Sequence, residues 1–346
     1  MEIGNKIKQL RIQAGLTQEQ LAVKLGISAQ SVSKWETAVT MPDITLLPPL
    51  ANELGVSIDE LFDLTVEQKL HRIERRIDIE EEFSPAVFHE YETFLKNQLV
   101  DDPKNSKLYS LLGQLYHHRM LSDARKVSKY ARHAIMLRPE LKECQYLLQK
   151  ADGASIWDWN VSNHTSVINF YKSVIENDHI DPKTPLPYYE VMDNLIADHR
   201  TDEAAEYLAI YQTLPAHKPF LVPVYQASIA LAEYDEPKAD AIMQDAETKF
   251  GDNSGFLFEK AQYHARKCEY DKAIHYYDLS WEMDKKPRYT DALEAIAIIY
   301  EIKGEKTKAL EAYDRMIQCI KEEWNYTDDD AAVIEVEREK KRLLSE

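Results

Sequence analysis

Apolar residues recur at helical spacing through the first part of the chain. Ile3, Ile7 and Leu10 lie three or four positions apart, and Gly15 follows where a residue with left-handed backbone would end a helix. The four residues from Thr17 read T-Q-E-Q, which is the T-x-x-Q form of a capping box. We therefore expect a second short helix to begin directly after Thr17.

A third helix is predicted over about Ala29–Thr37. Ser28 precedes it and is a good N-cap, because its hydroxyl can accept a hydrogen bond from a free N–H of the first turn. Val32 and Trp35 lie at i, i+3 and are expected to point inward. A turn containing Gly26 separates this helix from the second one.

Two further short helices are expected before residue 65. Thr45 can open the fourth, Pro48 and Pro49 are tolerated in its first turn, and Gly55 closes it. Ser57 starts a second capping box and a fifth helix. Five short helices with a glycine-containing turn at their centre predict a helix-turn-helix domain over residues 1–64.

This domain resembles the Xre family of helix-turn-helix regulators, which includes the lambdoid phage repressors. The resemblance rests on "LTQEQLAVKLGISAQSVSKWET…MPDITLLPPLANELGVSIDELF", residues 16–62. It implies that the third helix enters the major groove of double-stranded DNA while the second crosses the backbone. The residues that it implies at the DNA interface are Gln18, Ser28, Ala29, Gln30, Ser31, Ser33, Lys34 and Thr37.

Gln30 and Lys34 are the expected base readers. A carboxamide can make two hydrogen bonds to adenine, and a lysine can reach guanine or a phosphate. Gln18 and Thr37 would hold phosphates. The alternative is that Gln30 and Lys34 are ordinary solvated side chains.

The resemblance also implies an ion pair between Arg11 and Glu36, and the sequence departs from the family at two points. Ala29 stands where relatives often have Arg or Gln. Thr37-Ala38 replaces the common Arg/Asn-Gly, which removes a phosphate ligand and a glycine that tolerates left-handed backbone. Both departures favour weak binding by one domain and a dependence on dimerisation.

An amphipathic helix is predicted over Thr65–Glu82, within a linker segment of residues 65–83. Its apolar residues, from Val66 to Ile77, follow a 4-3-4 spacing. Two readings remain open. The helix either packs on the domain that follows or self-associates and pairs two DNA-binding heads.

Residues 84–327 contain a repeat of about 34 residues. Ala204, Ala239, Ala273 and Ala309 are spaced by 35, 34 and 36 residues, and a large residue follows each alanine four positions later. A small residue also precedes three of the four by twelve positions, where two helices would approach closely. This pattern resembles tetratricopeptide repeats, in which each repeat is a helical hairpin.

About six hairpins are expected. Residues 108–116 and 131–139 resemble one repeat with an irregular loop, and residues 140–150 and 165–176 another hairpin around Trp157 and Trp159. Residues 328–346 would hold a capping helix, Asp328–Leu344. The predicted fold is therefore all-α: a five-helix repressor-like helix-turn-helix domain followed by a tetratricopeptide-like α-solenoid.

Stacked hairpins leave a concave groove, and the phase of the repeat predicts which residues line it. The predicted groove residues are Tyr189, Asp193, Ser228, Phe258, Gln262, Arg266, Glu294 and Glu301. Such a mixture of aromatic, amide and charged groups can hold an extended peptide, and the order of domains resembles that of peptide-pheromone-sensing bacterial regulators. The alternatives are a solvated concave surface or a dimer surface.

Composition narrows the function further. The net charge is −18, but Met1–Thr40 carries +2, so the positive charge of this domain is weakly concentrated in its first three predicted helices. The three cysteines are isolated, and no P-loop, HExxH, GxSxG or Rossmann glycine pattern occurs. We therefore expect no enzyme, no cofactor and no metal site. A sequence without a membrane-length apolar run or a signal-peptide core predicts a cytoplasmic protein that does not bind membranes.

The function that these features favour is a dimeric, sequence-specific transcriptional regulator whose repeats sense a peptide or protein partner. Two rivals remain. One is a repeat scaffold or adaptor whose helix-turn-helix is vestigial. The other is an antitoxin or phage-type repressor that binds a protein partner.

Overall fold

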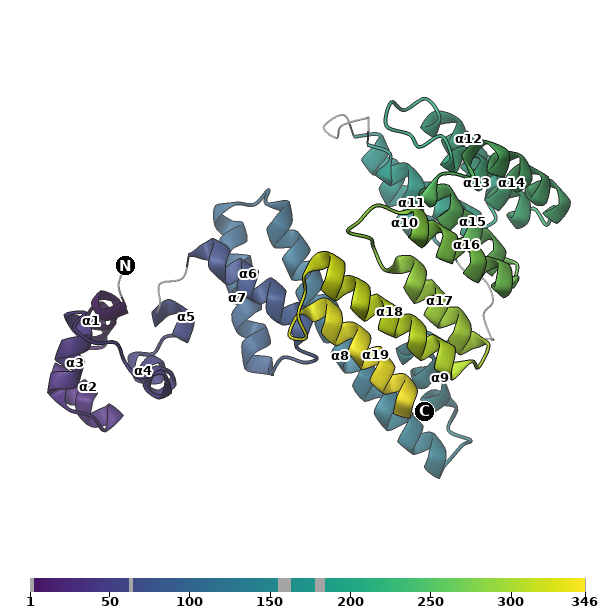
Figure 1. Ribbon diagram of the computed structural model, residues 1–346. Helices are drawn as coiled ribbons and strands as arrows, with labels where there is room; N and C mark the ends of the chain where they lie inside the picture. The colour runs from purple at the N-terminus through teal and green to yellow at the C-terminus, as the bar shows by residue number, and fades with distance from the viewer. Residues whose placement is uncertain (1–2, 62–64, 155–162, 178–183, 346) are drawn as a thin grey trace. The chain divides into compact units, whose positions relative to one another are not determined.

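The computed structural model describes residues 3–61, 65–154, 163–177 and 184–345, and all regular elements in these ranges are helices (Figure 1). This confirms the all-α prediction. The chain divides into two compact units, residues 1–126 and 127–346. Among the helices so described, none has both the length and the apolar character that crossing a membrane requires.

Residues 3–61 form the five short helices of the predicted helix-turn-helix domain. Their buried apolar side chains make one cluster, in which Ile7, Leu21, Val32 and Leu50 are fully enclosed. The elements are α1 (Ile3–Gln13), α2 (Gln18–Leu25), α3 (Ala29–Glu36), a 3₁₀ turn (Ile44–Leu46), α4 (Leu47–Leu54) and α5 (Ile58–Leu61).

The start of α4 differs from the prediction. Thr45 does not open the helix, because the Asp43 carboxylate accepts hydrogen bonds from both the Thr45 N–H, at 2.9 Å, and its hydroxyl, at 2.6 Å. Asp43 thereby caps a 3₁₀ turn, and α4 begins one turn later with its two prolines in the first turn. Gly55 ends α4 in the left-handed conformation, as expected.

The linker helix α6 (Val66–Ile79) packs against α7 (Pro85–Asp101) and the first half of α8 (Ser106–Leu137). Leu70 and Ile73 are buried in a cluster that also contains Phe88 and Leu95. Leu70, Ile73 and Ile77 of the apolar stripe therefore pack against their own chain, as the first of the two interpretations expected, whereas Val66 is exposed.

Helix α6 ends at Ile79, three residues before the predicted limit of Glu82. Glu80 adopts extended backbone, and its carbonyl oxygen lies 2.6 Å from a ring nitrogen of His118. This contact turns the carbonyl out of the helix and so ends the regular hydrogen-bond pattern.

Helix α8 also corrects the sequence reading. Residues 108–116 and 131–139 are not two helices joined by an irregular loop, because one helix runs unbroken from Ser106 to Leu137. The intervening residues contain neither proline nor glycine, so nothing in the chain interrupts the helix. Gly113 lies before this stretch and Pro139 beyond it.

Helical hairpins build the second unit, as predicted. The elements that follow α8 are α9 (Lys142–Ala151), α10 (Thr165–Ile175), α11 (Leu186–Ala197), α12 (Thr201–Tyr211), α13 (Leu221–Ala232), α14 (Glu236–Phe250), α15 (Ser254–Arg266), α16 (Tyr270–Met283), α17 (Asp291–Ile302), α18 (Lys306–Trp324) and α19 (Ala331–Ser345). Figure 1 shows α15 to α18 as antiparallel pairs in green and yellow.

The repeat alanines lie where the helices of each hairpin meet. Ala204, Ala239, Ala273 and Ala309 are all fully buried, as are the residues twelve positions before them, Met192, Ala227, Ala261 and Ala297. A larger side chain at any of these alanines would hold the two helices apart. The period therefore reports close helix packing.

The ends of the array differ from the regular repeats. Helices α9 and α10 both form, but Trp157 and Trp159 lie outside the described residues, and α10 packs against α11. The last helix, α19, buries Val333 on α18. It begins at Ala331 and not at Asp328 because the Asp330 carboxylate holds the preceding turn, accepting the N–H of Thr327 at 2.7 Å.

Candidate nucleic-acid interface and repeat groove

Helix α3 is fixed at both ends. At its start, the Ser28 hydroxyl accepts the N–H of Ser31 at 3.1 Å, as the predicted cap requires. Near its end, α1 approaches so closely that a Cβ on Gly4 would lie 2.0 Å from the Trp35 carbonyl oxygen. The outer face of α3 is thus presented by a rigid support.

The predicted DNA-contacting residues fall into two groups. Gln30 and Lys34 are exposed on α3, and so are Ser28 and Thr37 at its ends. The partly buried residues are Gln18, Ala29, Ser31 and Ser33. The exposed pair lies four positions apart, so both side chains project from one face of the helix.

Two of the predicted phosphate ligands already have partners within the domain. The Gln18 amide donates to the Glu36 carboxylate at 2.7 Å, and the Thr37 hydroxyl donates to the Ser33 carbonyl at 2.8 Å. The Gln18 amide has a second N–H that can still donate to a phosphate, whereas the Thr37 hydroxyl has a single proton and would have to leave the Ser33 carbonyl to do so.

An ion pair lies beneath this face, as the family resemblance implied. Arg11 Nε is 2.5 Å from one Glu36 oxygen and Arg11 Nη2 is 3.0 Å from the other. Burial alone would raise the pKa of Glu36, but hydrogen bonds from Arg11 and Gln18 outweigh it and hold the pKa below its usual value. The network ties α1, α2 and α3 together.

Ala38 follows α3 with φ at +57°, in the left-handed region. The sequence departs from the family pattern here by having no glycine, and the structure shows that the backbone keeps the glycine-like conformation nonetheless. The Cβ of an L-residue is strained in this region. The turn after α3 is therefore built on an unfavourable residue.

Gly4 is a residue of this domain that the sequence analysis did not single out. It lies inside a helix, where glycine is about 0.5–1 kcal/mol less favourable than alanine. An isolated glycine in a helical pattern often marks a close approach of another backbone, and that signal was available. Without the structure, its partner, the end of α3, could not be identified.

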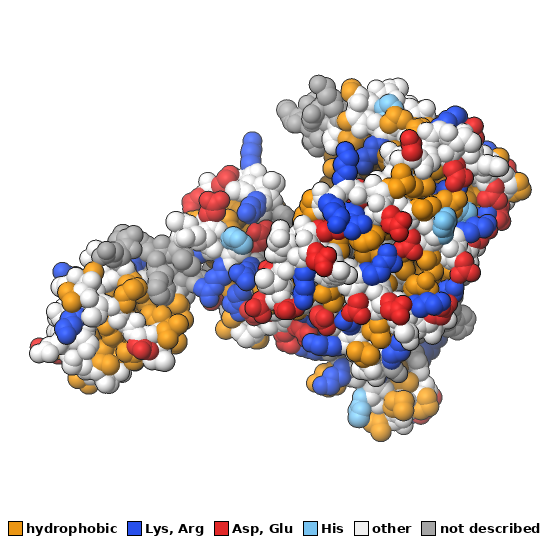
Figure 2. All heavy atoms as spheres, in the orientation of Figure 1, with side chains coloured by type: hydrophobic (Ala, Val, Ile, Leu, Met, Phe, Trp, Pro, Cys, Tyr) orange, Lys and Arg blue, Asp and Glu red, His pale blue; other side chains and the backbone are white. Residues whose placement is uncertain are grey.

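Charge on the domain is modest. Lys24 pairs with Glu53 at 2.6 Å and Arg11 with Glu36, so at least two of the five basic residues in positions 1–64 are already in ion pairs. Over the repeat helices, Figure 2 shows red and blue side chains interleaved in the face turned to the viewer. The domain therefore offers few cations to a phosphate backbone.

The repeat unit contains a groove cavity of about 310 Å³, which we call the acidic cavity after Asp193 and Glu259 in its wall; Lys218 and Arg266 line it as well. Helices α11, α13 and α15 supply most of its lining. Five of the eight predicted groove residues line it, namely Tyr189, Asp193, Ser228, Gln262 and Arg266. The repeat phase thus brings together side chains that are 77 positions apart along the chain.

The remaining three predicted groove residues lie elsewhere. Phe258 lines an adjoining cavity of about 470 Å³. Glu301 accepts hydrogen bonds from Tyr313 and from Arg342 of α19, each at 2.7 Å. Glu294 is exposed on α17, and neither glutamate lines either cavity. The capping helix thus engages Glu301, which the repeat phase alone did not reveal.

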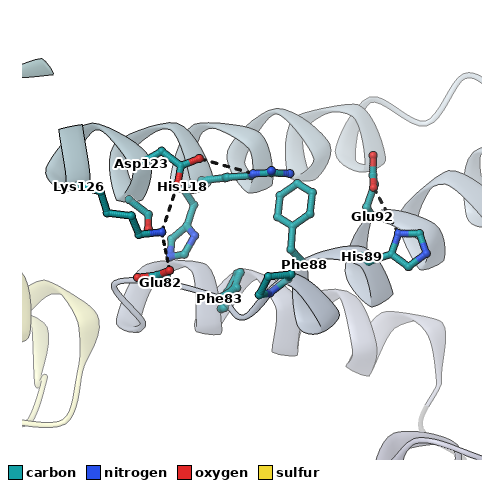
Figure 3. Close-up of a pocket in the computed structure, with 11 residues that line it drawn as sticks. Glu82, Phe83, Phe88, His89, Glu92, His118, Asp123 and Lys126 are labelled. Atoms are coloured by element: carbon teal, nitrogen blue, oxygen red, sulfur yellow. Dashed lines mark hydrogen bonds and ion pairs between the residues drawn. The ribbon is translucent and has the colours of Figure 1, made fainter. Parts of the chain in front are cut away.

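Another cavity, of about 240 Å³, lies in the first unit between α7 and α8. Figure 3 shows Phe83, Phe88 and His118 around it, with charged side chains at its edge. Lys126 pairs with Glu82 at 2.6 Å and with Asp123 at 3.2 Å. Because these charges satisfy one another, we assign no ligand to this cavity.

A glycine-containing turn between two short helices, with the second helix exposed and capped, defines residues 3–61 as a helix-turn-helix domain. Residues 7–61 match the family model described as Helix-turn-helix. An uncharacterized HTH-type transcriptional regulator from Methanocaldococcus jannaschii is 40% identical over 58 residues, which are 17% of this chain and 88% of that protein. The chain therefore belongs to this family of HTH-type transcriptional regulators.

Other relatives match the same region. The HTH-type transcriptional activator BcrR of Enterococcus faecalis is 42% identical over 62 residues, which is 18% of this chain and 30% of BcrR. The SPbeta prophage-derived regulator YonR of Bacillus subtilis is 39% identical over 59 residues, 17% of this chain and 55% of YonR. The chain therefore spans less than two thirds of either relative.

Solved structures resemble the whole chain more loosely. Bacillus thuringiensis PlcR in complex with the peptide PapR7 and DNA is 12% identical, with 100% of this chain and 99% of PlcR covered at a TM-score of 0.26. ComR from S. thermophilus, in complex with DNA and its signalling peptide ComS, is 12% identical, with 92% and 99% covered at a TM-score of 0.20. Such low TM-scores support no conclusion about residue roles or ligands in this chain.

Proposed function

We propose that the protein is a sequence-specific DNA-binding transcriptional regulator whose repeat domain senses a peptide or protein partner. The observation that carries the DNA-binding part is the exposed face of α3. Gln30 and Lys34 project from a helix that is capped at Ser28 and fixed by the contact of Gly4 with Trp35. Such a helix fits the major groove, where amide and ammonium groups can read base edges.

Dimerisation is part of the proposal. One head offers few cations, so its non-specific affinity for phosphate should be low, and specificity would come from two heads on matched half-sites. A signal bound in the groove would act by favouring one arrangement of the two heads. Access to chromosomal DNA also requires a cytoplasmic protein.

The sensing part of the proposal is supported by the acidic cavity and the cavity beside it. Both are concave and mix aromatic rings with a few charged groups, which is the usual character of a ligand site. The proposal assigns no catalytic step and no cofactor.

Retention of genomic DNA tests the DNA-binding part. Sheared chromosomal fragments are incubated with the full-length protein at low salt, and the retained fragments are sequenced. Wild type should enrich discrete sites, Gln30→Ala/Lys34→Ala should enrich none, and Lys24→Ala should keep the same sites because Lys24 lies off the α3 face. Equal enrichment by wild type and the double variant would remove the assignment of base readers.

Failure of the wild type to enrich any site would favour the rival scaffold, in which the helix-turn-helix is vestigial. The phage-type or antitoxin rival predicts something different. In that case the protein would enrich DNA sites, but its groove would retain a folded protein and no peptide. The two rivals are thus separated by the same protein preparation.

A further inference from the structure

The two groove cavities form one continuous site. Lys218, Leu221 and Glu259 line both the acidic cavity and its neighbour. The neighbour has large aromatic rings in its wall, including Phe258 and Trp281. One chain segment a few residues long could therefore fill both cavities, with a polar part in one and an apolar part in the other.

Glu259 is the unusual group in this site. Its side chain on α15 is half-buried, and no residue in the described ranges donates a hydrogen bond to it or forms an ion pair with it. Burial, together with the nearby negative charge of Asp193, raises the pKa of Glu259. A half-buried carboxylate without a partner is unfavourable in the free protein.

Asp193 is the second carboxylate of the acidic cavity. Its side chain is open to the cavity, beside the Tyr225 hydroxyl. Desolvation by the surrounding protein still raises the pKa of Asp193. The ring of Tyr225 stacks with that of Tyr189 at 6.4 Å between centroids, so aromatic faces lie beside the carboxylates.

The other charged groups do not neutralise these carboxylates. Arg266 and Lys218 are exposed, and Arg266 donates to the Ser228 hydroxyl at 3.1 Å. Both cations lower the pKa of Glu259 through space, but neither forms an ion pair within the described part of the chain. Glu190 adds a further negative charge near Asp193.

We infer that the site binds an extended peptide that carries a positive charge. Its ammonium or guanidinium group would lie on Asp193 and Glu259, and a bulky apolar side chain beside it would enter the cavity of Phe258 and Trp281. A cation supplies the missing partner of Glu259, and tyrosine faces add favourable cation–π contacts. This inference rests on the proposed peptide-sensing function and adds the chemistry of the ligand.

The test uses the full-length protein and three pools of synthetic seven-residue peptides with randomised sequences free of Lys, Arg and His. The first pool is N-acetylated with arginine at a fixed central position. The second has citrulline there, which keeps the shape and removes the charge. The third has citrulline and a free N-terminal amino group, so it distinguishes the two sources of positive charge. Retention is measured by equilibrium dialysis and mass spectrometry.

Wild type should retain the arginine pool or the free-amine pool about tenfold or more above the neutral pool, as a charge-assisted hydrogen bond implies. Glu259→Gln and Asp193→Asn should abolish this preference, whereas the matched control Glu294→Gln should keep it. Equal retention of charged and neutral pools by wild type would overturn the inference and leave peptide sensing intact. A preference that survives in both cavity variants would also overturn it.

No retention of any pool would contradict the proposed peptide sensing itself, and with it this inference. Misfolding is checked by thermal unfolding. Because a raised pKa means that the ionised carboxylate is less favourable in the folded state, removing the charge with Glu259→Gln should keep or raise the melting temperature near neutral pH. Retention of the charged pool should also fall as the carboxylates are protonated at lower pH.

Discussion

Replacing Ala38 by glycine should stabilise the helix-turn-helix domain. Ala38 has φ at +57°, and left-handed backbone costs an L-residue about 1–2 kcal/mol relative to its ordinary conformation. Glycine removes that strain, but it gives the unfolded chain more freedom, which offsets about 0.4–1 kcal/mol. The expected net gain for Ala38→Gly is about 0.5–1 kcal/mol.

Amide hydrogen exchange of the full-length protein measures this change locally. Peptides covering Ala29–Glu36 should exchange about two- to fivefold more slowly in Ala38→Gly than in wild type, if exchange follows local opening. Gly15→Ala is the matched control of opposite sign, since Gly15 has φ at +69° and a Cβ there would meet no atom within 4 Å. Unchanged or faster exchange in Ala38→Gly would refute the strain argument.

Three further predictions concern the same domain. Gly4→Ala should lower the melting temperature and weaken DNA binding, because the new Cβ would lie 2.0 Å from the Trp35 carbonyl oxygen. Gly113→Ala is the control and should change neither property, because its Cβ would meet no atom within 4 Å. An unaltered melting curve for Gly4→Ala would contradict the contact. Glu36→Gln should cost about 3–5 kcal/mol in urea unfolding near neutral pH, since it leaves Arg11 without its counter-charge. The pKa of Glu36 is lowered in the folded state, so the difference in free energy of unfolding between wild type and Glu36→Gln should depend on pH. It should be complete above the ordinary glutamate pKa and disappear as pH falls through the lowered value. A difference that does not change with pH would contradict this prediction. The slope of log affinity for DNA against log salt should be shallower for a dimer than the value of about −9 that all ten basic residues of two heads would give. Arg11 and Lys24 of each head are held in ion pairs, so a slope of about −10 or steeper would place further cations at the interface.

Sequence patterns between neighbouring residues were enough to predict most of the fold. Capping residues at Thr17 and Ser28 begin helices where predicted, because a cap is a contact between near neighbours in sequence. The repeat alanines predicted the hairpins equally well, because close packing of the two helices in every hairpin requires a small residue at a fixed period. Five of the predicted groove residues share one cavity for the same reason.

Contacts between residues far apart in the sequence could not be predicted in the same way. The end of α6 depends on His118, 38 positions away from Glu80. The partner of Glu301 is Arg342, on a helix outside the repeat pattern. The repeat phase did not predict Glu259 as a groove residue, because it placed the neighbouring Phe258 in the groove instead. The structure shows that Glu259 lines the cavity and has no hydrogen-bond or ion-pair partner among the described residues.

The outer face of α3 is the surface that we propose reads base pairs. Selection of binding sites from a randomised DNA pool, with wild type and Gln30→Ala side by side, tests it most directly. Wild type should yield a consensus with two half-sites, and Gln30→Ala should lose discrimination at one base pair of each half-site by roughly 1–3 kcal/mol while retaining the rest. An unchanged consensus from Gln30→Ala, or no consensus from wild type, would contradict the account.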